Sequence, residues 1–160
     1  YDLDDKIKKI FAVDVGYGQL DWKLKSNSRV VTLDRKNARN LDKTDIGELV
    51  DLAVIDVSFI SLKLIIPSII NILKSDGDLI ALVKPQFEVG REEVENKGII
   101  KNPKKHLNVL FELNSFMKEK SCSAIRKDAF WPLMSPSKHI IGQLKNFQIK
   151  FIWLSVKAVP

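Results

Sequence analysis

Four short apolar runs in this chain each end in an ionisable residue, and this pattern constrains the fold more than any other feature. The runs end, in chain order, at Asp14, Asp34, Asp56 and Lys84. Short apolar runs bounded by turn residues are typical of buried strands. One acid at a strand end is ordinary. Four ionisable residues at corresponding places indicate one edge of a parallel sheet, where the carboxyl ends of the strands meet.

The fourth run, residues 79–83, is continuously apolar, which predicts a strand buried on both faces. Lys84 follows at its carboxyl end, and Pro85 prevents further strand pairing there. Because ligands of open α/β sheets bind outside the carboxyl ends of the strands, this position favours a chemical role for Lys84. The alternative is a lysine that merely extends its ammonium into water from the strand end.

Two helical patterns accompany these runs. Apolar residues recur every three or four positions between residues 62 and 73, which predicts a core-facing helix that Pro67 either kinks or starts. Asn102 and Pro103 predict the start of a second helix. Strands that alternate with helices predict an α/β fold with a mostly parallel sheet and helices on both faces. The core-facing positions expected in the second helix are His106, Val109, Leu110, Leu113, Phe116 and Met117.

Composition is that of an ordinary globular protein, with 45% apolar and 29% charged residues, so we expect one domain over residues 1–160. Cys122 is the single cysteine, which excludes an internal disulfide framework and a cysteine-rich metal cluster. No apolar run approaches the roughly 20 residues that cross a bilayer. These features predict a cytoplasmic protein with no membrane partner.

The formal net charge of +6 comes entirely from residues 118–160, which hold eight Lys and Arg against Glu119 and Asp128. A basic region of this kind suits a polyanion such as RNA. A solvated lysine-rich surface explains the same charge equally well. Trp131, in the same region, either stacks on a base or packs at the sheet edge. Residues 149–156 predict a further strand, and residues 123–129 a weaker one.

The turn after the first run contains Val15, Gly16 and Gly18. An acid at the end of the second strand of a nucleotide-binding sheet typically binds the ribose hydroxyls, and Asp14 is the candidate for this position. A glycine-rich cofactor loop would precede this strand, so the two glycines give weak support for a cofactor site. The charged segment 88–101, after Lys84, is expected to be either a mobile loop over the same sheet edge or a plain connection.

Four motifs resemble those of one known family. They are Asp-Val-Gly-Tyr-Gly-Gln-Leu at 14–20, Asp-Val-Ser-Phe-Ile-Ser-Leu at 56–62, Val-Lys-Pro-Gln-Phe-Glu at 83–88 and Lys-Gly-Ile-Ile-Lys-Asn-Pro at 97–103. In this order and spacing they resemble the hemolysin A (TlyA-like) branch of the FtsJ-type ribose 2'-O-methyltransferases. The resemblance covers about residues 6–135.

This resemblance implies a Rossmann-like methyltransferase that uses S-adenosylmethionine and acts on ribosomal RNA or a ribosomal subunit. In that family a lysine, an aspartate, a second lysine and a glutamate surround the target hydroxyl. Asp56 matches the aspartate and Lys84 the second lysine. We hypothesise that Lys84 is the base or the hydroxyl orienter and that Asp56 positions it. The resemblance also implies cofactor contacts from Asp14, Val15, Gly16, Asp34 and Arg35.

The chain departs from the family pattern at both ends. The resemblance implies that the first strand, the glycine-rich cofactor loop and the first lysine lie upstream of Tyr1 and so are absent from this chain. Residues 145–150 stand where the family carries Gly-Asn-x-Glu, without an acid. Because the missing strand would be central, we expect an open slot in the sheet and a homodimer formed through exposed strands. Two functions remain open: an RNA methyltransferase, or a non-catalytic RNA-binding or interaction protein that keeps the fold.

Overall fold

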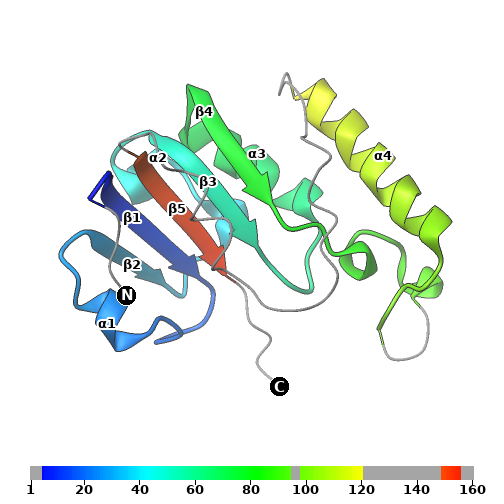
Figure 1. Ribbon diagram of the computed structural model, residues 1–160, viewed down its shortest axis with the longest axis horizontal. Helices are drawn as coiled ribbons and strands as arrows, with labels where there is room; N and C mark the ends of the chain where they lie inside the picture. Colours follow the sequence, from blue (N-terminus) through cyan, green and yellow to red (C-terminus); the bar gives the residue numbers. More distant parts are fainter. Residues whose placement is uncertain (1–4, 95–97, 121–148, 156–160) are drawn as a thin grey trace.

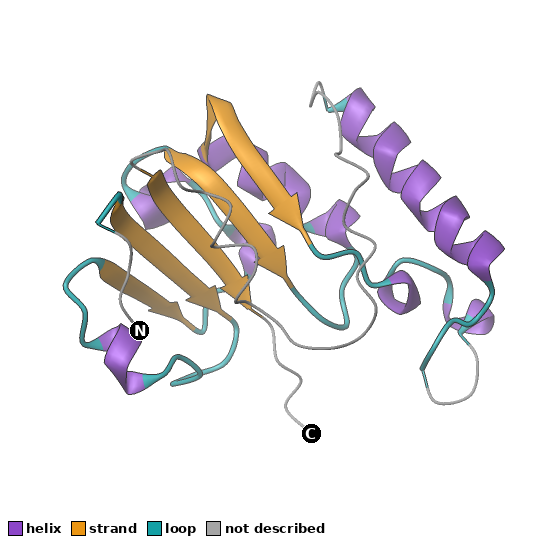
Figure 2. Cartoon of the chain, in the orientation of Figure 1, coloured by secondary structure: helices purple, strands orange, loops and turns teal. Residues whose placement is uncertain are grey.

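The computed structural model describes residues 5–94, 98–120 and 149–155, with the backbone alone for the last segment. Its centre is a five-stranded sheet in which every strand pair is parallel, in the order β2-β1-β5-β3-β4. Figure 1 shows the five strands running in one direction, and Figure 2 separates them from the helices by colour. The strands are β1 (Ile7–Asp14), β2 (Val30–Asp34), β3 (Val50–Asp56), β4 (Leu73–Ala81) and β5 (Ile149–Ser155).

Strand β5 occupies the centre of the sheet, and this overturns the expected open slot. It pairs with β1 on one side and with β3 on the other, with Ile152 in register with both Phe11 and Ala53. The two strands expected to be left unpaired are therefore paired within one chain, and Figure 1 shows β5 lying between them. The physical reason is that β5 supplies the ladder of N–H and C=O groups that the neighbouring edges require. The argument for a dimer through those two edges is thus removed.

Strand β4 was predicted to be buried on both faces, and this expectation is wrong. The strand lies at the edge of the described sheet, with β3 as its neighbour there, and its residues are half-buried or exposed. Leu79 and Ala81 pack against the main core, Ile80 packs on the other face, and Leu82 is exposed. A continuous apolar run therefore marked an edge strand with apolar contacts on both faces, not a central one.

The main core lies on one face of the sheet. Inward residues of β1 and β3, among them Phe11 and Ile55, pack against helix α3 (Ile66–Ile72) and the buried Val109 and Leu113 of helix α4 (Pro103–Glu119). On the other face the apolar cluster around Ile10, Leu52 and Val54 contains, in the described part of the chain, strand residues only. The other helical segments are α1 (Trp22–Lys25), η1 (Ala38–Asn40), α2 (Lys43–Ile46), η2 (Leu62–Leu64), η3 (Pro85–Phe87) and η4 (Arg91–Glu93).

Both predicted helix starts are confirmed. Pro67 lies in the first turn of α3 and does not kink it, because a proline there lacks only an N–H that would have no helical partner. The Asn102 side chain accepts a hydrogen bond of 2.9 Å from the Lys104 amide at the start of α4. One expected core position of α4 is wrong: Leu110 is 39% exposed and extends the surface formed by Leu107 and Phe111.

Candidate functional site

The predicted alignment of ionisable residues along the carboxyl edge of the sheet is confirmed. Asp14 and Asp34 are in register at the ends of β1 and β2, and Asp56 ends β3. Lys84 lies in the loop after β4. The end of β5 separates two groups of residues, because Ser155 of β5 is in register with Asp56. With strands about 4.8 Å apart, the backbones of Asp14 and Asp56 are roughly 10 Å apart.

The first group is built around Lys84. Its Nζ atom lies 2.7 Å from Oδ1 of Asp56 and donates a hydrogen bond of 2.9 Å to Oγ of Ser58. The side chains of Lys84 and Asp56 are 24% and 31% exposed, so the pair is partly screened and still reachable from solvent. An ammonium has three N–H donors. Described residues use two of them, so among those residues one donor remains for an acceptor that enters from solution.

Phe59, which the sequence analysis did not single out, lies beside this group. It is 71% exposed and has a positive φ of 64°, which is uncommon for a residue with a side chain. Its ring lies 4.9 Å from the ring of Phe87, measured between centroids. A non-glycine residue keeps such a backbone conformation only where the surrounding structure imposes it, and residues of this kind cluster at functional sites. The signal available in the sequence was an aromatic residue three positions after the strand-end acid Asp56.

The second group is built around Asp14, which is 9% exposed. The Gly16 amide donates a hydrogen bond of 2.7 Å to Oδ1 of Asp14, and the Lys36 amide donates one of 3.0 Å to the Asp14 carbonyl. The Arg35 amide also bonds the Gly16 carbonyl at 2.9 Å, which joins the turns after β1 and β2. A Cβ atom at Gly16 would lie 3.1 Å from Asp14 Oδ1, so a side chain there would crowd the carboxylate.

Asp34 and Arg35 complete the second group. Lys25 lies 3.5 Å from Oδ2 of Asp34, and the Arg35 guanidinium lies 4.9 Å from the centroid of the exposed Tyr17 ring. Arg35 has a φ of 57°, which turns the chain sharply at the end of β2. The structure therefore brings together Asp14, Gly16, Asp34 and Arg35, with the exposed Val15 in the same turn.

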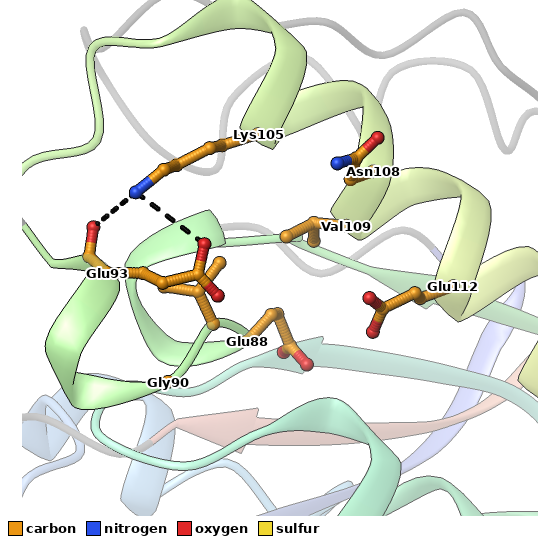
Figure 3. A pocket seen from close by; sticks show the side chains of 8 residues that line it. Glu88, Gly90, Glu93, Lys105, Asn108, Val109 and Glu112 are labelled. Atoms are coloured by element: carbon orange, nitrogen blue, oxygen red, sulfur yellow. Dashed lines mark hydrogen bonds and ion pairs between the residues drawn. The ribbon is translucent and has the colours of Figure 1, made fainter.

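A cavity of about 160 Å³ lies behind the loop that carries Lys84, between the segment 88–93 and helix α4. Figure 3 shows Lys105 above it, with both dashed contacts directed to Glu93. His106 faces the backbone, with Nε2 2.7 Å from the Ile100 carbonyl oxygen. The cavity is lined by Glu88, Val89, Gly90, Glu93, Lys105, Asn108, Val109 and Glu112.

Several expected features lie outside the described residues: the strand at 123–129, Trp131 and most of the basic region. Within the described ranges, no cluster of His, Cys, Asp and Glu is arranged to hold a metal ion. The same ranges contain no helix with the length and apolar character needed to span a membrane.

A parallel α/β sheet with acids at the ends of β1 and β2, and with a lysine-aspartate pair after β3 and β4, has the arrangement of Rossmann-like folds, in which ligands bind outside the carboxyl ends of the strands. Residues 3–132 match the model of the FtsJ-like methyltransferases. The chain belongs to that family, as the sequence motifs predicted.

Named relatives fit this assignment. The chain is 48% identical over 101 residues to the 16S/23S rRNA (cytidine-2'-O)-methyltransferase TlyA of Mycobacterium tuberculosis, which covers 63% of this chain and 38% of the relative. It is 30% identical over 156 residues to the 23S rRNA (cytidine-2'-O)-methyltransferase TlyA of Campylobacter jejuni, covering 97% of this chain and 56% of that one. The chain thus spans about two-fifths to just over half of these relatives.

A solved structure supports the fold. The crystal structure of a Lactococcus lactis protein described as a hemolysin is 43% identical and superimposes with a TM-score of 0.67. The match covers 70% of this chain and 54% of that one. The predicted α/β methyltransferase fold is therefore confirmed.

Proposed function

We propose that this chain is the methyltransferase domain of an enzyme that methylates ribose 2'-hydroxyls of ribosomal RNA. The observation that carries the proposal is the Lys84 ammonium, held at 2.7 Å by Asp56 and at 2.9 Å by Ser58 at the carboxyl edge of the sheet. The names of the relatives, rRNA (cytidine-2'-O)-methyltransferases, support the choice of substrate.

In this proposal Lys84 and Asp56 have different roles. The remaining N–H of Lys84 donates to the 2'-oxygen of the target ribose and fixes the direction of one of its lone pairs. Asp56 holds the ammonium in place, and its carboxylate is the acceptor for the proton released as the new carbon–oxygen bond forms. Of the two roles considered for Lys84, this arrangement favours the hydroxyl orienter, because Nζ is held by Asp56 and Ser58 in a position from which it can donate an N–H to the substrate oxygen.

We propose S-adenosylmethionine as the methyl donor, which when bound supplies an electrophilic sulfonium methyl. The described residues fit its adenosine half. The buried carboxylate of Asp14 suits ribose hydroxyls, and a glycine at position 16 places no Cβ atom against that carboxylate. Asp34 and Arg35, at the end of β2, are placed next to the same pocket. We assign all five predicted residues, Asp14 to Gly16 with Asp34 and Arg35, to this half.

The cofactor assignment is tested with Asp14→Asn. Asparagine keeps the oxygen that accepts from the Gly16 amide, so the turn is preserved, but it removes the charge that would bind two hydroxyls. We expect calorimetric titration with S-adenosylmethionine to show an affinity about 10- to 100-fold lower than that of the unaltered chain. Asp78→Ala removes an exposed acid from β4 and serves as the control. Equal affinity of Asp14→Asn and the unaltered chain would contradict the assignment.

Phe59 is proposed to stack on the base of the target nucleotide. Its exposed ring lies in the loop that carries Ser58, so a base on this ring would leave its ribose near Lys84. Because stacking is worth about 1–3 kcal/mol, Phe59→Ala is expected to lower kcat/KM for RNA about 10-fold or more. Phe111→Ala, which removes an equally exposed ring from α4, should leave kcat/KM unchanged. The two variants should melt within a few degrees of the unaltered chain.

A direct assay separates the enzyme from a non-catalytic RNA-binding protein with the same fold. Purified chain is mixed with ribosomal subunits and S-adenosylmethionine carrying a labelled methyl group, and the label in rRNA is counted. Label that survives alkaline hydrolysis as a 2'-O-methylated dinucleotide supports the proposal. RNA binding without transfer of label, by a chain that does bind the cofactor, would favour the non-catalytic alternative.

A further inference from the structure

Glu88 makes contacts that join two loops of the site. Its Oε2 accepts a hydrogen bond of 2.6 Å from the Ser61 hydroxyl, and its Oε1 accepts one of 2.9 Å from the Leu62 amide. Ser61 and Leu62 follow β3, whereas Glu88 follows β4 and the short helix η3. We call residues 57–62 the β3 loop and residues 82–88 the β4 loop.

The two loops touch at three successive places. Nearest the strands, Lys84 of the β4 loop binds Asp56 and Ser58. In the middle, the rings of Phe59 and Phe87 meet. Farthest from the strands, Glu88 binds Ser61 and Leu62. Hydrogen bonds to an ionised carboxylate are stronger than neutral ones, so the outermost contact is an effective clamp.

The clamp acts on the residue whose backbone is strained. Phe59, with its φ of 64°, lies between Ser58, which is tied to Lys84, and Ser61, which is tied to Glu88. A non-glycine residue keeps such a conformation only when its surroundings impose it. Release of Ser61 would let the β3 loop relax at Phe59 and carry Ser58 away from Lys84.

The Glu88 carboxylate binds the β3 loop, whereas Lys105, the basic side chain that lines the same cavity, binds Glu93. In Figure 3 the Glu88 carboxylate lies at the cavity wall, while Lys105 contacts Glu93, at 2.9 Å from its carbonyl and 3.6 Å from its carboxylate. Glu93 lines the same cavity and has no described contact with either loop. It therefore offers a matched control for the removal of one negative charge.

We propose that Glu88 is a positioning residue: by clamping the β3 loop to the β4 loop it fixes Ser58 and Phe59 relative to Lys84. The expected effect of the clamp on turnover rests on the proposed methyl transfer, whereas the clamp itself is a contact between the two loops. In this proposal Glu88 acts through its bonds to Ser61 and Leu62 and not by contact with the methyl donor or the RNA. Its effect on turnover passes through the position of the Lys84 ammonium.

The first test does not depend on activity. The chain is treated with limiting acetic anhydride, and acylation of each lysine is measured by mass spectrometry of peptides. We expect Glu88→Gln to raise the acylation rate of Lys84 by about threefold to tenfold, since the ammonium loses its fixed partner Ser58. Lys36 and Lys74, which pair with acids elsewhere, should react at unchanged rates. Glu93→Gln should leave the rate of Lys84 unchanged.

The second test measures turnover. In Glu88→Gln, kcat for rRNA is expected to fall about tenfold, while KM for S-adenosylmethionine changes less than twofold, because Asp14 lies across β5 from the clamp. Ser61→Ala should lower kcat similarly, and the double variant should be no worse than either single one, as residues acting through one contact are not additive. A general loss of folding would instead weaken cofactor binding in parallel with kcat.

The two tests separate failure of the inference from failure of the proposed function. An unchanged Lys84 acylation rate in Glu88→Gln would overturn the clamp whatever the activity. A raised rate in a chain that transfers no methyl group to rRNA would sustain the clamp and remove the proposed function. A raised rate with an unchanged kcat would overturn the positioning role.

Discussion

Lys84→Ala is expected to lower the rate of methyl transfer to rRNA by about 10²- to 10³-fold, the contribution of a preorganised hydrogen-bond donor at the reacting oxygen. The Lys84 ammonium is held between Asp56 and Ser58 and presents a hydrogen-bond donor to the substrate. Truncation removes that donor and leaves the Asp56 carboxylate without its cation. The measurement is single-turnover transfer of a labelled methyl group with saturating cofactor and ribosomal subunits.

Lys74→Ala is the matched control for this experiment. Lys74 also pairs with an acid of β3, Asp51, but at the opposite end of the same two strands. Each variant therefore removes one ion pair with an acid of β3, and of the two lysines Lys84 is the one at the carboxyl edge. We expect Lys74→Ala to retain near-full activity. If Lys84→Ala retained it as well, in a chain proven active, the proposed role of Lys84 would be wrong.

Ile152→Pro is expected to unfold the sheet, with a loss of about 3 kcal/mol or more in the free energy of unfolding. Ile152 is in register with Phe11 on one side and with Ala53 on the other. A proline there removes an N–H from the ladder, and prolines are excluded from central strands for this reason. Chemical denaturation followed by circular dichroism measures the loss.

Ile152→Val keeps the backbone N–H and a branched side chain, so its midpoint of denaturation should stay close to that of the unaltered chain. Amide hydrogen exchange adds a local readout, since the protection of β1 and β3 should fall in Ile152→Pro before that of other elements. Denaturation midpoints that do not differ between the two variants would show that β5 does not occupy the centre of the sheet.

Much of the fold could be predicted from the sequence because the strand ends and helix starts depend on residues that are close together in the chain. The strand-end acids Asp14, Asp34 and Asp56 lie along one edge, as expected, and both helix starts were visible as Pro67 and Asn102-Pro103. The strand at the end of the chain was also predicted. Its place in the sheet was not, because strand order depends on pairings between distant residues that leave no periodic signal. The family pattern therefore suggested a vacant slot, which β5 fills.

The candidate site was also predictable in part. The motifs pointed to Asp56 and Lys84, and the structure places these side chains in contact. The roles proposed for Phe59 and Glu88 were not predictable, because one depends on a positive φ and the other on a contact between loops far apart in sequence. Backbone conformation and loop packing are tertiary properties, which residue spacing alone does not encode.

The central place of β5 also determines the order in which the sheet can form. The pairs β1–β2 and β3–β4 each join nearby segments, whereas β5 must close two long loops to reach Phe11 and Ala53. Closing long loops costs more chain entropy, and distant pairings are formed slowly. Refolding should therefore form the β1–β2 and β3–β4 pairs first. The later pairing of β5 with β1 and β3 then joins them into one cooperative sheet.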